Sequence, residues 1–406
     1  MAPLVRTVLP PRLGVSFRWL VASSWATNFG DGISAAAGPL LVASLTGDPF
    51  LISMAALLAW APPLILALYA GVLSDRHDRR RIVLIANVVR MLVLAGMIAT
   101  LAGGRLTVWL ALLGLGLLST AEVFADNTTG TLAPMLVARD DLALANARLG
   151  AGFVTLNQLA GPPIGAALFA VGRAWPLAAE VLLLCAGTLL VARVTLPPHG
   201  REEPGGNVLR EVVEGVRFVV RHPAVRTLSL IVLIFNLAFG AAWSLLVLYA
   251  TEWLGLGSIG YGLFTTAGAL GGILGTLTYG WLTARVSLGN LMRIGLIIET
   301  CTHLILGVTR SAWVALPTFF VFGVHEFVWG STATTIRQRA VPAHLQGRVG
   351  AVNRICIYGG LVVGAAFGGV VASRYGVVAP FRVAFVGALI FLVILWPQTK
   401  HIAHDD

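Results

Sequence analysis

Long runs of apolar residues, separated by short polar segments, repeat along the whole chain. A membrane-spanning helix needs about 20 apolar residues, and twelve runs approach or exceed that length. The expected spans are 19–44, 51–73, 82–102, 106–132, 146–171, 175–195, 226–250, 258–282, 288–308, 313–335, 348–373 and 378–396. The pattern predicts an all-α integral membrane protein in which short connections join antiparallel neighbouring helices.

One long polar stretch interrupts this pattern, at residues 197–223. It begins as a Pro- and Gly-rich linker and continues as a helix with valines on one side and charged residues on the other. Such a helix is expected to rest on the inner surface of the membrane. The predicted domains are an N-terminal six-helix bundle at 1–196, the linker with its surface helix at 197–225, and a C-terminal six-helix bundle at 226–406.

The two halves share short motifs in the same order and at similar offsets. Each match is weak alone because Gly is common here, but their consistent order indicates a duplication. The matched pairs are Gly161 with Gly360, Gly165 with Gly364, Arg148 with Arg348, and Gly71 with Gly280. Two parallel repeats of six spans are typical of one large class of secondary transporters.

Composition supports a membrane protein and removes several other classes. The chain is 57% hydrophobic and 11% charged, whereas soluble domains carry about 25% charged residues. The net charge of +10 does not indicate nucleic-acid binding, because the arginines are scattered between apolar runs. Lys400 is the only lysine, so a phosphate-binding P-loop is excluded. We expect no nucleotide, cofactor or metal ion, no enzymatic activity, and a monomer.

The distribution of basic residues predicts the orientation. Most of the 28 arginine and lysine residues fall in alternate connecting segments and the two termini. By the positive-inside rule, both termini are then cytoplasmic and the protein is a multi-pass protein of the plasma membrane. The few basic residues on the opposite side are Arg105, Arg173, Arg310, Arg374 and Arg382.

The connection after the second span is the most distinctive segment of the chain. Its dense charge must lie outside the hydrocarbon, and its residues include Gly71, Leu73, Asp75, Arg76, Arg79 and Arg80, with Asp78 between the arginines. This spacing resembles motif A of the major facilitator superfamily, in which a second glycine usually stands at the place of Asp78. The motif Gly161-Pro162-x-x-Gly165 in the fifth span looks like the exporter-type motif C. The resemblance is closest to the drug-exporter branch that includes macrolide and siderophore exporters.

The resemblance implies a latch that closes the cytoplasmic side. Gly71 would let spans two and eleven approach, and Asp75 would accept hydrogen bonds near 347–350 at the start of span eleven. An arginine at 76, 79 or 80 would pair with Asp126. Alternatively, these charges only maintain topology.

The motif that begins at Gly161 carries a separate implication. Gly161 with Pro162 and Pro163 would form a hinge or a tight seam that the family associates with export. The alternative is a tolerated kink.

Ionisable residues inside spans are costly and are functional hypotheses by default. Asp31, three residues after Asn28, is the main candidate for binding a proton or a cationic substrate. The alternative is a neutral Asp31 hydrogen-bonded among the helices. Glu122 lies one turn before Asp126 and is a second coupling candidate, or else a structural partner of Arg90.

The second half carries a further group of ionisable residues. Glu299 and His303 are one turn apart in span nine, and His325 and Glu326 are adjacent in span ten. We expect them to pair or to line water, although a lone His on an apolar helix is more often a satisfied buried group. Aromatic residues form either a substrate cavity or ordinary packing: Trp25, Trp60, Trp243, Trp329 and Phe239.

These observations predict a secondary transporter that exports a small hydrophobic or amphipathic compound, such as a drug, macrolide or siderophore, in exchange for protons. Two bundles would alternate in exposing a central site, with the substrate, protons and the lipid bilayer as its partners. The alternatives are an importer or lipid flippase of the same fold, or a membrane protein that does not transport.

Overall fold

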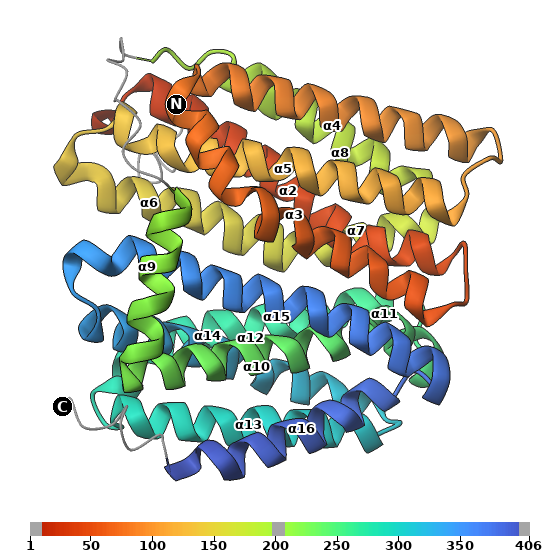
Figure 1. The fold of residues 1–406 in the computed structure, drawn as a ribbon. Coiled ribbons are helices and arrows are strands. Elements are labelled where there is room, and N and C mark those ends of the chain that lie inside the picture. Colours follow the sequence, from red (N-terminus) through yellow and green to blue (C-terminus); the bar gives the residue numbers. More distant parts are fainter. Residues whose placement is uncertain (1–9, 197–207, 398–406) are drawn as a thin grey trace. The chain divides into compact units, whose positions relative to one another are not determined.

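The computed structural model describes residues 10–196 and 208–397, and these ranges are almost entirely helical, with no β-strand. The first half contains η1 (Pro11–Leu13), α2 (Val15–Ala43), α3 (Pro49–Arg76), α4 (Arg79–Ala102), α5 (Val108–Leu136), η2 (Arg139–Asp141), α6 (Leu142–Gly152), η3 (Phe153–Ala160), α7 (Gly161–Val171) and α8 (Ala174–Val191). The second half contains α9 (Val208–Arg221), α10 (Pro223–Trp243), α11 (Leu246–Leu248), η4 (Tyr249–Trp253), α12 (Ser258–Thr283), α13 (Leu288–Val308), α14 (Ala312–Ala340), η5 (Ala343–Leu345), α15 (Gln346–Tyr375) and α16 (Ala379–Leu395) (Figure 1).

A helix or a continuous helical segment lies at each predicted span. Within the described ranges, nine of these segments are long and apolar enough to cross a membrane. The remaining predicted spans coincide with α2, with α12 and with α16, which is shorter. The prediction of an all-α integral membrane protein is confirmed.

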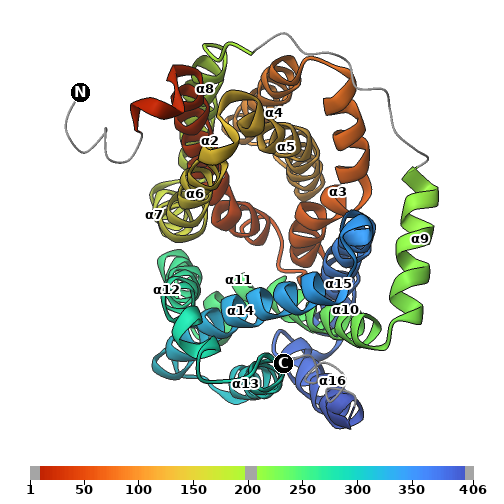
Figure 2. The same cartoon turned by 90° about the vertical axis from the view of Figure 1, so that its left-hand side faces the viewer.

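The chain divides into two compact units by its internal contacts. The first unit contains residues 1–45 and 65–205, and the second contains 46–64 and 206–406. Helix α3 therefore contributes its first part to the second unit and its last part to the first. Figure 2 looks along most of the helices of each unit.

In each unit, glycines allow close packing of two helices, and the two pairs of helices occupy matched positions of the sequence repeat. In the first unit, a methyl group at Gly161 or Gly165 of α7 would overlap the backbone of α2. In the second unit, a methyl group at Gly360 or Gly364 of α15 would overlap the backbone of α10. The sequence repeat thus corresponds to two equivalent helix contacts, each close enough to require glycine.

Helix α4 begins at a side-chain cap. The carboxylate of Asp78 accepts hydrogen bonds from the backbone N–H groups of Arg80 and Arg81. Asp is one of the best residues for this position, because it satisfies amide groups that the helix leaves free. Its φ of −60° is ordinary, so the turn does not require the glycine that motif A usually has there.

Helix α9 runs across the direction of α10 and α15 in Figure 1 and packs against both. Gly215 lies directly on the backbone of Arg348, and Glu214 forms an ion pair with the Arg348 guanidinium at 2.9 Å. Val213, Val216 and Val220 are exposed. The predicted amphipathic helix therefore exists, and it has a packed face as well as an exposed apolar stripe.

Candidate functional site

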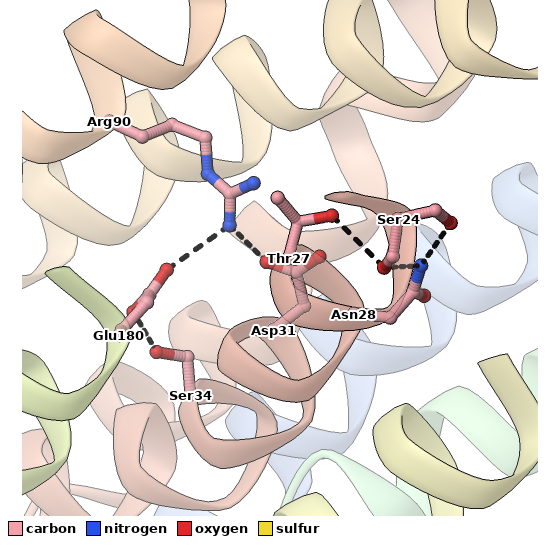
Figure 3. A network of polar contacts seen from close by, with 7 residues as sticks. All are labelled: Ser24, Thr27, Asn28, Asp31, Ser34, Arg90 and Glu180. Carbon is pink, nitrogen blue, oxygen red and sulfur yellow. Dashed lines mark hydrogen bonds and ion pairs between the residues drawn. The ribbon is translucent and has the colours of Figure 1, made fainter. Parts of the chain in front are cut away.

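A buried ion-pair network occupies the interior of the first unit. The guanidinium Nη2 of Arg90 donates a hydrogen bond to Oδ1 of Asp31 and lies 3.1 Å from Oε1 of Glu180 (Figure 3). The exposed fractions of these side chains are 2% for Arg90, 6% for Asp31 and 1% for Glu180. One permanent cation thus faces two carboxyl groups that water scarcely reaches.

Three helices place this network. Asp31 is on α2, Arg90 on α4 and Glu180 on α8, so the three groups meet only through tertiary packing. A methyl group at Gly30 would lie 3.3 Å from Cγ of Glu180, and one at Gly187 would lie 2.7 Å from Cγ2 of Thr27. The two glycines allow α8 to lie close to α2 and bring its carboxyl group within reach of Arg90.

Hydroxyl and amide groups continue the network along α2. Ser34 donates a hydrogen bond to the other oxygen of Glu180, so both oxygens of that carboxyl group have partners. Towards the start of the helix, the side-chain amide of Asn28 donates hydrogen bonds to the backbone carbonyl oxygen and the hydroxyl oxygen of Ser24. Figure 3 shows these residues following one side of α2.

A small polar cavity of about 20 Å³ adjoins the network. Asn87 is buried, and neither atom of its amide group has a hydrogen-bond partner among the described residues. The Nε of Arg90 is likewise without a partner. A cavity of this size holds about one water molecule, which these groups are placed to bind. The lining residues are Ser23, Ser24, Thr27, Asn28, Val83, Asn87, Arg90, Ala125, Asp126 and Thr129.

Two further carboxyl groups on α5 act on the network. Glu122 and Asp126 interact electrostatically with both Asp31 and Arg90. Asp126 is exposed, Glu122 is half-buried and Asp31 is buried. The three carboxyl groups therefore differ in exposure, and Asp126 also lines the cavity beside Arg90. The structure brings together Asn28, Asp31, Glu122 and Asp126, all predicted from the sequence, with Glu180, which was not predicted.

The exporter-like motif of the fifth span lies against this site. A methyl group at Gly161 would lie 2.6 Å from the backbone of Gly32, the residue after Asp31. Gly165 packs on Ile33 in the same way, and Pro162 is buried at the first turn of α7. A π-helix precedes them, a form that is frequent at functional sites. Gly161 and Gly165 thus pack closely against α2 at the residues that follow Asp31, and a role of this motif in export stays a prediction.

The second unit contains a separate buried cluster. The carboxylate of Glu299 lies 3.5 Å from Nδ1 of His303 on the same helix and 3.7 Å from Nε2 of His325 on α14. Glu326 is exposed. Among the described residues, no group of three or more His, Cys, Asp or Glu side chains is arranged to hold a metal ion.

Aromatic side chains surround this cluster. Trp243 packs against Phe239 with ring centroids 4.6 Å apart, and Trp60 lies 6.5 Å from Phe239. Trp329 instead stacks on Phe235 at 4.9 Å. Three of the five expected aromatic residues thus form one half-buried group. Trp25, in the first unit, donates a hydrogen bond to a backbone carbonyl and has a structural role.

The residues expected to form a latch are only partly described. Arg79 donates hydrogen bonds to the carbonyl oxygens of Ser74 and Thr131. Arg76 is exposed, Arg80 is half-buried, and Gly71 has open space around it. The side chain of Asp75 lies outside the described part of the structure. An arginine paired with Asp126 stays a prediction.

The sequence matches the model of a known family over residues 6–403, a family described as transmembrane secretion effector. The chain belongs to this family of the major facilitator superfamily. The match covers nearly the entire chain and confirms the resemblance found in its motifs. Members of this superfamily are membrane transporters and not enzymes.

Several relatives are efflux proteins. Macrolide efflux protein A of Streptococcus pyogenes is 24% identical over 383 residues, with 89% of this chain and 90% of the relative covered. Multidrug efflux pump Tap of Mycolicibacterium fortuitum is 27% identical over 413 residues, with 96% of each covered. Enterobactin exporter EntS of Escherichia coli is 25% identical over 397 residues, with 94% and 92% covered.

Solved structures share the fold at low sequence identity. A bacterial homologue of the iron transporter ferroportin has a TM-score of 0.76 at 17% identity, over 95% of this chain and 98% of its own. The nucleoside transporter NupG has a TM-score of 0.77 at 11% identity, over 95% and 100%. The predicted major facilitator fold is therefore confirmed, and the protein is a multi-pass membrane transporter.

Proposed function

We propose that this transporter exports a small hydrophobic or amphipathic compound across the plasma membrane in exchange for protons. The observation that carries the proposal is the buried network of Arg90 with Asp31 and Glu180. Three efflux proteins among its relatives, which are named for macrolide, multidrug and enterobactin export, support the direction and the substrate class.

The charges of the network require a proton. Arg90 keeps its proton under all physiological conditions, so it balances one of the two carboxylates that contact it. A second ionised carboxylate in this buried place is strongly disfavoured, because its charge is neither solvated nor paired. When the site is closed to water, Asp31 and Glu180 therefore share one proton between them.

The same charges explain how proton binding drives a conformational cycle. A proton that enters from outside neutralises Asp31 or the half-buried Glu122. The neutral site is easier to bury and holds a cationic substrate less strongly, which favours the return to the cytoplasm-facing state. For an uncharged substrate, the charge of one proton that crosses 100 mV supplies about 2.3 kcal/mol, enough for roughly 50-fold accumulation of that substrate.

Other parts of the proposal concern topology and gating. The proposed topology has both termini in the cytoplasm, which the distribution of arginines supports, with twelve spans between them. Gly71, Asp75 and the arginines at 76, 79 and 80 form the cytoplasmic latch, and the half-buried aromatic group of the second unit contacts the apolar part of the substrate. The transporter acts as a monomer.

Everted membrane vesicles test the direction and the coupling. We expect an inward-acidic pH gradient to drive fluorescent dye or radiolabelled macrolide into vesicles that contain the wild-type protein. Asp31→Asn should abolish this gradient-driven uptake. Glu180→Gln removes one negative charge beside Asp31, so the remaining carboxylate is balanced by Arg90 and binds a proton only at lower pH. Its half-maximal transport should shift to lower pH.

A carboxylate outside the site provides the control. Glu252 is exposed, and Glu252→Gln should behave like the wild type. Accumulation driven by the opposite gradient would indicate an importer. If neither gradient moves any probe, or if Asp31→Asn transports normally, the proposal is wrong.

A further inference from the structure

The cluster of Glu299, His303 and His325 is not used by the Arg90 network, and its geometry leaves several buried polar atoms unsatisfied. Nδ1 of His303 lies 3.0 Å from the backbone carbonyl of Glu299. A carbonyl only accepts hydrogen bonds, so this nitrogen carries hydrogen. The neutral ring then has its lone pair on Nε2, which has no partner among the described residues.

The other members of the cluster are equally short of partners. Both carboxylate oxygens of Glu299 and Nε2 of His325 form no hydrogen bond with the described residues. The exposed fractions of the side chains are 4% for Glu299, 0% for His303 and 1% for His325. With both rings neutral and Glu299 ionised, the cluster carries one buried negative charge, which is costly unless a positive charge joins it.

No fixed cation of the described chain supplies this charge. On the neighbouring helices, Arg382 donates to the carbonyl of Gly307, and the hydroxyl of Tyr249 donates to the carbonyl of Leu306. Other titratable or charged groups on the elements packed against the cluster include Glu326 on α14, which interacts electrostatically with Glu299 and His325, and Arg382 on α16, Tyr249 on η4 and Cys356 on α15.

Matched positions of the internal repeat carry opposite charges in the two halves. Arg90 and Glu299 are 209 residues apart, as are the matched glycines Gly71 and Gly280. Each is also the twelfth residue of its helix. The first half therefore has a cation at this position with carboxylates around it, and the second half has a carboxylate without a cation. The missing charge must come from outside the described chain.

An aromatic surface adjoins the cluster. The ring of Trp243 lies 5.7 Å from that of His303 and packs against Phe239. Both Trp243 and Phe239 are half-buried, and Trp243 also packs against Phe322 at 4.6 Å and Phe319 at 5.2 Å. The faces of aromatic rings attract organic cations, most strongly at tryptophan. A cation held on these rings would lie beside the negative charge of Glu299.

We infer that Glu299, His303 and His325 form a second site for one positive charge, taken in turn by a proton and by an organic cation held against Trp243 and Phe239. The inference rests on the proposed function, because it names the substrate class as amphipathic monovalent cations. Cation binding releases the proton from the cluster, and a returning proton displaces the cation. The total charge of the occupied site is zero in both cases.

A binding experiment on the purified full-length protein in lipid nanodiscs tests this. Tetraphenylphosphonium serves as the cationic probe, and triphenylphosphine oxide serves as an uncharged one. Calorimetry in buffers of different ionisation enthalpy counts released protons. In the pH range where the cluster is protonated, we expect about one proton to be released for each cation bound, none for the neutral probe, and a roughly tenfold loss of cation affinity for each pH unit of acidification.

Variants locate the site. Glu299→Gln should lose proton release and weaken cation binding at least tenfold, while binding of the neutral probe shows that the variant is folded. If Glu299→Gln does not fold, Glu299→Asp keeps the charge and should still release a proton. Trp243→Leu should weaken cation binding without changing the number of protons released per cation bound.

Several results would overturn the inference. They are cation binding without proton release, unchanged proton release in Glu299→Gln, and loss of proton release in Asp31→Asn instead. Because no transport is measured, these results are independent of the vesicle experiment. An export failure with normal proton release would reject the proposed function and keep this site.

Discussion

Gly161 of α7 lies against Gly32 of α2, so closely that a methyl group on Gly161 would be 2.6 Å from the Gly32 backbone. Gly32 directly follows Asp31, the carboxylate that contacts Arg90. The glycine-proline motif of the fifth span therefore sets the position of the helix that carries the candidate proton site. The sequence indicated that this motif could break a helix. In the structure, its glycines allow α7 to pack closely on α2 because they have no side chain.

Replacement of Gly161 should separate the two helices. We expect Gly161→Ala to lower stability by about 1–3 kcal/mol, since overlap with backbone atoms is relieved only by a shift of α2 or α7. The apparent melting temperature in detergent measures this effect. Gly150→Ala is a matched control on α6, because open space surrounds Gly150. Equal melting temperatures for the two variants would contradict the close contact.

Removal of the cation of the network should cost more. Arg90→Gln leaves Asp31 and Glu180 buried without a positive charge, and loss of one partner of a buried ion pair typically costs about 3–5 kcal/mol. Asp31→Asn combined with Arg90→Gln should recover part of that loss. Thermal unfolding followed by tryptophan fluorescence reports both variants. The exposed Arg374 provides the comparison, and an Arg90→Gln variant as stable as Arg374→Gln would show that the network is not structural.

The N-cap residue of α4, Asp78, allows the stabilities of three variants to be ranked. Asp78→Ala should lower stability by about 1 kcal/mol, whereas Asp78→Gly, the residue usual in the motif, should cost only a few tenths. Asp78→Asn keeps an oxygen acceptor and should be close to the wild type. Chemical unfolding curves resolve this order. An alanine variant as stable as the wild type would mean that the hydrogen bonds to Arg80 and Arg81 contribute nothing.

The contact between α9 and α15 separates a charge effect from a packing effect. Glu214 and Arg348 are both substantially exposed, at 47% and 32%, so Glu214→Ala should change stability by about 1 kcal/mol or less. Gly215→Val should cost more, because its side chain would enter the backbone of Arg348. Limited proteolysis near α9, compared between these variants, measures the difference. Greater cleavage of Glu214→Ala than of Gly215→Val would reverse this ranking.

Much of the fold could be predicted because each helix that crosses the lipid needs a run of about 20 apolar residues. A helix lies at each predicted apolar run, and α9 lies where the amphipathic surface helix was predicted. The repeat around Gly161 and Gly360 was visible as well, since close helix contacts need small residues at fixed spacing. Spacing along one helix also brought Glu299 and His303 into the same prediction, and the structure places them 3.5 Å apart.

Contacts between helices were harder to predict. Glu180 was missed although it is a single carboxylate within a long apolar run, a signal that deserves a functional hypothesis by itself. Its partner Arg90 is 90 residues earlier in the chain, and no local pattern relates the two. The pairing of Asp126 with an arginine after the second span stays a prediction, and the sequence did not indicate that Asp126 also lines the cavity beside Arg90.

The guanidinium of Arg90 has a consequence for any compound that the protein carries. It is an internal counter-ion tethered by its own side chain, so the carboxyl groups around it are never without a positive neighbour. A diffusing cation can compete only for the negative charge that this tethered group leaves unbalanced. In the first half, a cationic substrate must therefore compete with Arg90 for the carboxylates that surround it.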